Sequence, residues 1–127
     1  MNIQKRAIQA AQATNMQTNA ITMIDLHGRL DAHQSKAVDN ALIDHIEEGS
    51  QTIVNLRGVH FIDSTGLAIL VRAVKRHREQ SGELLLCELQ QPVQIILELT
   101  KLERVFSIYP TEAAALQSLQ LQQSVLA

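Results

Sequence analysis

The chain has 127 residues, of which 46% are hydrophobic and 19% are charged, and its formal net charge is -2 at pH 7. These values are typical of a single globular domain and argue against a nucleic-acid-binding protein, which usually carries a basic surface. A single cysteine, Cys87, excludes an intramolecular disulfide, and the longest apolar runs are far too short to span a membrane. Because the first residues also lack the apolar stretch of a signal peptide, we expect a cytoplasmic protein with no membrane attachment.

The N-terminal part of the chain contains one ambiguous segment and one clear strand. Residues 1–19 are rich in Gln, Ala, Asn and Thr, and we treat them as a segment outside the main domain. Within it, Ile3–Ile8 fits an edge strand and Gln4–Gln12 fits a short helix equally well, and part of the segment is expected to be disordered. Ala20–Leu30 is apolar on both faces, which predicts a strand covered on both sides, and Gly28 suggests a bulge or a close backbone approach in it.

A helix and a second strand follow. Asp31 fits the N-cap of a helix that Gly49 ends, and its apolar residues recur at helical spacing: Ala37, Val38, Ala41, Leu42 and Ile46. The next apolar run predicts a strand over Thr52–Leu56, and Arg57-Gly58 predicts a turn after it.

The C-terminal half continues the alternation of helices and strands. A helix ending near Gln80 places an apolar stripe on one face, formed by Leu67, Leu70, Val71 and Val74. We then predict a strand over Glu83–Leu89, a helix from Pro92, a strand over Val105–Tyr109 and a helix from Thr111, with residues 121–127 as a frayed tail. This order predicts one α/β domain over residues 20–120, with a mainly parallel or mixed sheet and about four α-helices.

The stretch Phe61–Leu70 joins an apolar strand to a helix through a short polar turn. Asp63, Ser64 and Thr65 are all suitable N-cap residues, because their short side chains can accept from free N–H groups of the first helical turn. A hydroxyl at this place is exposed and lies near the positive end of the helix dipole, which favours a phosphate group. The position therefore suits a phosphate, but the local sequence alone favours a plain helix cap as the role of Ser64.

No arrangement of residues predicts catalysis, a cofactor or a metal site. The histidines are scattered and lack metal-ligand spacing: His27, His33, His45, His60 and His77. A hydrolase would need Ser64 as nucleophile and His60 as base, but the Gly-x-Ser-x-Gly turn and an orienting acid are missing. The glycine-rich phosphate-binding loops of nucleotide-using enzymes are missing too. We expect a protein that is not an enzyme.

Three short motifs carry a resemblance to a known family. Asp63-Ser64-Thr65-Gly66-Leu67, with Gly28-Arg29-Leu30-Asp31 upstream and Ser81-Gly82-Glu83-Leu84 downstream, strongly resembles the STAS domain family. Its closest branch is the single-domain anti-sigma factor antagonists of bacterial partner-switching systems. The resemblance implies that Ser64, with Thr65 as the less favoured alternative, is phosphorylated by a cognate anti-sigma factor or switch serine kinase. A PP2C-type phosphatase would restore the serine.

The resemblance also implies a binding surface for the kinase around the turn and the outward side of its helix. We expect the partner-binding residues to be Asp63, Ser64, Thr65, Gly66, Ala68, Ile69 and Arg72. Ile69 could equally pack under a neighbouring loop. The basic cluster of Arg72, Lys75, Arg76 and Arg78 fits a solvated helix face better than the alternative, a site for a polyanion. The alternative function is a STAS scaffold or subunit of a larger signalling or transport assembly that is never phosphorylated. In either case we expect a monomer or weak dimer.

Overall fold

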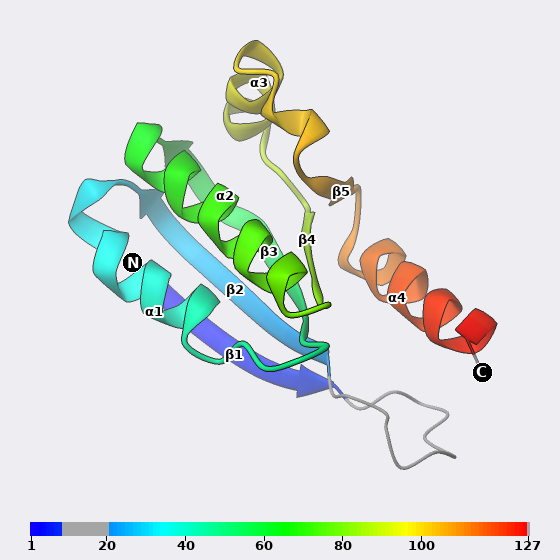
Figure 1. The fold of residues 1–127 in the computed structure, drawn as a ribbon. Coiled ribbons are helices and arrows are strands. Elements are labelled where there is room, and N and C mark those ends of the chain that lie inside the picture. Colours follow the sequence, from blue (N-terminus) through cyan, green and yellow to red (C-terminus); the bar gives the residue numbers. More distant parts are fainter. Residues whose placement is uncertain (9–20, 127) are drawn as a thin grey trace.

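The computed structural model describes residues 1–8 and 21–126, with side chains through Gln120, and contains one five-stranded sheet in the order β1-β2-β3-β4-β5 (Figure 1). The strands are β1 (Asn2–Ile8), β2 (Ile21–Leu30), β3 (Gln51–Ile62), β4 (Glu83–Cys87) and β5 (Ser107–Tyr109). β1 is antiparallel to β2, and the other pairs are parallel. The α-helices of the described residues are α1 (Ser35–Ile43), α2 (Ser64–Glu79), α3 (Gln91–Leu99) and α4 (Glu112–Leu126). The predicted α/β fold with a mainly parallel sheet and four helices is confirmed.

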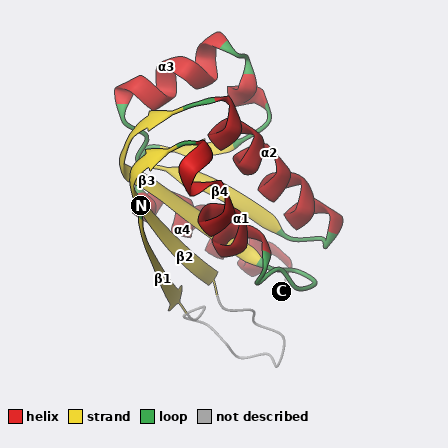
Figure 2. Ribbon diagram, turned by 90° about the vertical axis from the view of Figure 1, so that its left-hand side faces the viewer, coloured by secondary structure: helices red, strands yellow, loops and turns green. Residues whose placement is uncertain are grey.

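The two faces of the sheet are covered by different helices. α1, α2 and α3 pack on one face, where Leu42, Leu70 and Leu97 join the larger apolar cluster with residues of β2, β3 and β4. α4 packs on the opposite face through Ala115 and Leu119. In both views α3 lies at the end of the sheet where β3 finishes, and α1 and α2 lie side by side (Figures 1 and 2). None of the helices in the described ranges is long and apolar enough to cross a membrane.

The first strand resolves the ambiguity of the N-terminal sequence for residues 2–8. Asn2–Ile8 pairs with Ile21–His27 as an antiparallel edge strand, the first of the two alternatives. Residues 9–12 of the alternative helix lie outside the described residues. The strand buries little except Ile3 and Ile8, whose partial burial on the two faces of the sheet explains why its apolar pattern is weak.

The predicted turn at Arg57-Gly58 is wrong, because β3 continues through these residues to Ile62. The pairing of β2 with β3 changes register between Asp25 and His27, so the extra residue of β3 is accommodated as an irregularity within the sheet. The Asn55 side-chain oxygen accepts from the Arg57 N–H at 2.9 Å, which satisfies a backbone donor at that point. Arg57-Gly58, which the sequence indicated as a turn, therefore lies at a bulge within β3.

Several other predicted boundaries also differ from the structure. Asp31 caps a short 3₁₀ turn at Ala32–Gln34 by accepting from the His33 N–H, and α1 ends at Ile43, before Ile46. β4 and β5 are each shorter than predicted at one end. α4 reaches Leu126, so the backbone is helical across most of the tail for which fraying was expected.

A buried polar chain fixes the C-terminal half of α2 to β3. His77 is fully buried; its Nδ1 lies 2.7 Å from the Ala73 carbonyl, and its Nε2 lies 2.7 Å from the Thr52 hydroxyl. Because a carbonyl only accepts, Nδ1 carries the proton, and neutral His77 accepts the Thr52 O–H at Nε2. The His45 Nε2 lies 3.0 Å from the same hydroxyl and donates to it. Burial lowers the pKa of both histidines. With both rings neutral, each of these three hydrogen bonds has one donor and one acceptor, and the buried Nδ1 of His45 is left without a partner.

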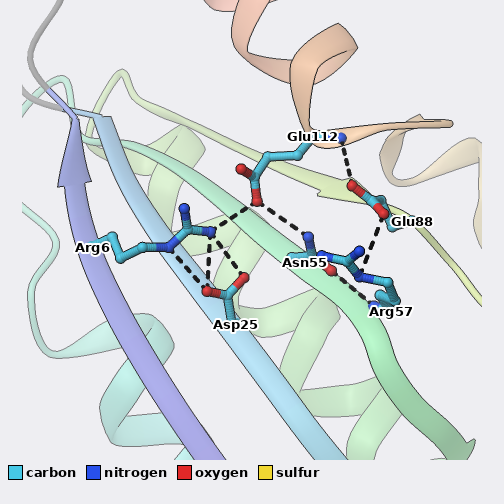
Figure 3. Close-up of polar contacts among 6 residues, drawn as sticks. All are labelled: Arg6, Asp25, Asn55, Arg57, Glu88 and Glu112. Atoms are coloured by element: carbon cyan, nitrogen blue, oxygen red, sulfur yellow. Dashed lines mark hydrogen bonds and ion pairs between the residues drawn. The ribbon is translucent and has the colours of Figure 1, made fainter.

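A second polar network joins α4 to the strands beneath it (Figure 3). It consists of Arg6, Asp25, Asn55, Arg57, Glu88 and Glu112. Glu112, at the start of α4, accepts from Arg6 at 2.9 Å and from Asn55 at 3.2 Å, and its own N–H donates to Glu88. Burial raises the pKa of Glu112, but the hydrogen bonds from Arg6 and Asn55 and the nearby positive charges outweigh it, so the pKa is lowered. The first turn of α4 is thus bound to β1, to β3 and to the residue that follows β4.

Candidate functional site

The site is built around Asp63, which joins the ends of two neighbouring strands. Its Oδ1 accepts from the Gly66 N–H at 2.9 Å, which makes Asp63 the N-cap of α2. Its Oδ2 lies 3.3 Å from the Ala32 N–H, in the turn that follows β2. The Asp63 N–H also donates to the Leu30 carbonyl at 3.2 Å. One carboxylate therefore holds the beginning of α2 against the beginning of the segment that leads into α1.

Ser64 is the first residue of α2, not its cap, so the expectation that Ser64 caps the helix is wrong. The cap position is occupied by Asp63, whose backbone is extended. Ser64 is exposed, and Thr65 is half-buried. Since Asp63 does the capping, the Ser64 side chain is not needed for the start of the helix, and its hydroxyl is open to solvent at the positive end of the helix dipole.

Two residues expected at the partner surface belong to the core instead. Ile69 is only 1% exposed and packs in the larger apolar cluster, so its prediction as a contact residue is wrong. Gly66 is buried as well: a Cβ there would lie 2.3 Å from the Leu30 carbonyl oxygen. The close approach that requires this glycine is therefore made by β2 of the same chain, not by a partner.

The exposed side of α2 forms one wall of an open groove of about 600 Å³. The expected residues Ser64, Ala68 and Arg72 lie together along it, while Asp63 and Thr65 do not line it. Leu102, from the short 3₁₀ turn Leu102–Arg104, is the lining residue contributed from outside α2. The complete lining is Ser64, Leu67, Ala68, Val71, Arg72, Lys75, Arg76, Glu79 and Leu102.

Sequence reasoning missed most of this groove because it assigned Leu67 and Val71 to the core stripe. The buried stripe of α2 is instead displaced around the helix, to Gly66, Ile69, Leu70, Ala73, Val74 and His77. Leu67 and Val71 are only partly buried and line the groove. Residues three, seven and eleven positions after Ser64 share its side of the helix, so Leu67, Val71 and Lys75 can be assigned to the groove once the exposed side of α2 is known.

Three observations concern the other reactive side chains in the described part of the chain. Within the described residues, His60 and Ser64 are both exposed and form no hydrogen bond with each other. No group of three or more His, Cys, Asp or Glu residues in the described ranges could hold a metal ion. Cys87 is fully buried, and burial raises the pKa of its thiol to about 12, so it is a packed core residue.

The double role of Asp63 predicts a measurable cost of its removal. Asp63→Ala loses both acceptor oxygens and is expected to lower the free energy of unfolding by about 1–2 kcal/mol. Asp63→Asn keeps one oxygen and is expected to retain part of that stability. Urea denaturation followed by circular dichroism measures both variants, with Asp44→Ala, an exposed residue at the end of α1, as the control. Equal stability of Asp63→Ala and wild type would contradict the capping role.

Known proteins resemble this chain in sequence and in fold. A profile of the STAS domain matches residues 12–115. The chain is 27% identical over 103 residues to the anti-sigma F factor antagonist of Paenibacillus polymyxa, covering 80% of this chain and 88% of that protein. It is 33% identical over 86 residues to the anti-sigma-B factor antagonist of Listeria monocytogenes, covering 67% and 75%. The solved structure of the anti-sigma factor antagonist SpoIIAA in its unphosphorylated form superposes with a TM-score of 0.67 at 20% identity, covering 91% of this chain and 96% of that one. The chain belongs to the STAS domain family.

Proposed function

We propose that this protein is an anti-sigma factor antagonist. In this proposal it binds an anti-sigma factor that is also a serine kinase, and phosphorylation of Ser64 switches that binding off. The observation that carries the proposal is the exposed Ser64 hydroxyl at the first position of α2, at one end of the groove. The family and the names of similar proteins support it. The protein acts as a cytoplasmic binding partner and kinase substrate, with no catalysis of its own.

The position of Ser64 suits a group that gains and loses charge without unfolding the domain. A phosphoserine carries about -1.5 to -2 charges near neutral pH. At the start of a helix this charge is favoured by about 0.3–1 kcal/mol, although the neighbouring Asp63 carboxylate opposes it. A docked partner instead meets additional bulk and a charge that must lose its water. The modification therefore acts mainly on binding.

Phosphate transfer from a cognate kinase tests the proposal. The purified protein is incubated with ATP and each serine kinase of the partner-switching type from its host, and the phosphate is mapped by mass spectrometry. We expect one phosphate on Ser64, none on Ser64→Ala, and unchanged labelling of Thr65→Val. A PP2C-type phosphatase from the same host should remove it.

The contrary results are distinct from one another. Labelling of Ser64→Ala at Thr65 would place the acceptor at the neighbouring residue. The absence of phosphate with every such kinase would contradict the switch and favour an unphosphorylated STAS scaffold.

A further inference from the structure

The exposed side of α2 changes character along its length. Beginning at Ser64, the groove is first apolar, with Leu67, Ala68 and Val71, and Leu102 faces them from the 3₁₀ turn. Farther along, its lining is basic, with Arg72, Lys75 and Arg76. Arg72 lies eight positions after Ser64, which corresponds to about 12 Å along the helix axis. An apolar patch thus lies between a phosphate-accepting end and a cationic end.

The positive charges of this groove are poorly neutralised within the chain. Arg72 lies 3.3 Å from Asp39 of α1, but the two side chains are 51% and 38% exposed, so water screens the pair. Lys75 and Arg76 are exposed, and neither forms an ion pair with any residue of the described segments. Glu79 is the one acid in the lining of the groove, at its far end. The groove is therefore positively charged, although the net charge of the whole chain is -2.

We propose that the groove binds an acidic, partly apolar segment of the partner protein. Apolar side chains of that segment would cover Leu67, Val71 and Leu102, and its carboxylates would lie at Arg72, Lys75 and Arg76. The charge of the groove supports this occupant, because complementary charges raise the rate of association and set the orientation of a complex. The inference rests on the proposed function only for the identity of the partner as the kinase that modifies Ser64.

This chemistry accounts for the direction of the switch. An acidic segment lying along the groove would meet a phosphate on Ser64 as a charge of the same sign. The Debye length is about 8 Å at physiological salt, so repulsion reaches the part of the segment over the apolar patch but little of the part over Arg76. The basic end therefore attracts the partner whether or not Ser64 is phosphorylated. The apolar contacts form only when Ser64 is unphosphorylated.

The test compares two pairs of charge-neutralising substitutions that change the net charge equally. Lys75→Gln with Arg76→Gln removes two cations of the groove, while Lys5→Gln with Lys36→Gln removes two exposed cations that do not line it. Affinity for the purified kinase that phosphorylates Ser64 is measured by titration calorimetry at about 50 mM and about 300 mM NaCl, a range over which screening changes strongly. Circular dichroism verifies that each variant is folded.

We expect the groove variant to bind about tenfold more weakly than wild type at the lower salt concentration and to lose most of the salt dependence. The control variant should match wild type at both concentrations. Equal affinity and equal salt dependence of all three proteins would overturn the acidic occupant, while phosphorylation of Ser64 by the same kinase would leave the proposed function intact. Binding of wild type that strengthens as salt rises would also overturn it.

Discussion

Phosphorylation of Ser64 is expected to weaken binding of the kinase about a hundredfold, equivalent to about 2.8 kcal/mol, and to change the free energy of unfolding by less than about 1 kcal/mol. The large effect arises at the interface, where a charged group is buried against a partner. The small effect arises within the chain, because Ser64 is exposed and Asp63, not Ser64, caps the helix. Titration calorimetry and urea denaturation measure the two quantities separately.

Ser35 provides a matched control for the phosphate-mimicking variant Ser64→Asp. It is also the first residue of an α-helix, but it lies on α1 and does not line the groove. Ser35→Asp therefore adds the same charge at an equivalent helical position and should bind the kinase like wild type. If Ser64→Asp binds as tightly as Ser35→Asp, or if its loss of binding is matched by a loss of folded protein, a local block at Ser64 is not the mechanism.

The fold is expected to lose stability steeply as the pH falls below about 6.5, the ordinary pKa of histidine. Burial lowers the pKa of His77 and of His45 in the folded chain, with Lys5 lowering that of His45 further and Asp44 opposing it. The unfolded chain therefore binds more protons below this pH, so the stabilisation is complete above it and declines below it. Each excess proton costs about 1.4 kcal/mol per pH unit.

His77→Phe tests this expectation through the slope of stability against pH rather than through stability at one pH. Its unfolding free energy, measured by urea denaturation between about pH 8 and about pH 5, should fall less steeply than that of wild type, by about one proton. His33→Gln, which removes an exposed histidine, should keep the wild-type slope. An unchanged slope in His77→Phe would show that His77 is not the responsible group. The lowered pKa of Glu112 acts at more acidic pH and is separate from this window.

The helices and strands of the core were predictable because their apolar residues recur at regular spacing. The incorrect predictions share a physical cause: they concern residues whose structure is set by neighbours in space, not by neighbours in the sequence. Arg57-Gly58 has the composition of a turn, but the pairing of Gly58 with His27 continues the strand. Ile69 could be placed inside or outside only once the rotation of α2 was known, since apolar residues cover more of that helix than the sheet can bury.

The position of the candidate site at Asp63 and Ser64 could be predicted from the sequence. The contacts of this site with other segments of the chain could not. Helix-capping chemistry indicated the position of the turn from local sequence alone. The second bond of Asp63, to the Ala32 N–H, depends on β2 and β3 lying next to each other in parallel, which no local pattern reveals. The same holds for Leu102, which reaches the groove from a segment that follows α3.

The order of the strands in the sheet has a consequence for how the chain is made. Each strand pairs with the next one in the sequence, so the sheet can grow along one direction as the polypeptide leaves the ribosome. α1, α2 and α3 are available to cover the first face during this growth, but Ala115 and Leu119 of α4, which cover Met23, Ile53 and Leu85 on the second face, come last. A nascent chain therefore exposes an apolar surface until α4 emerges, and Glu112 then binds Arg6 at the opposite edge of the finished sheet.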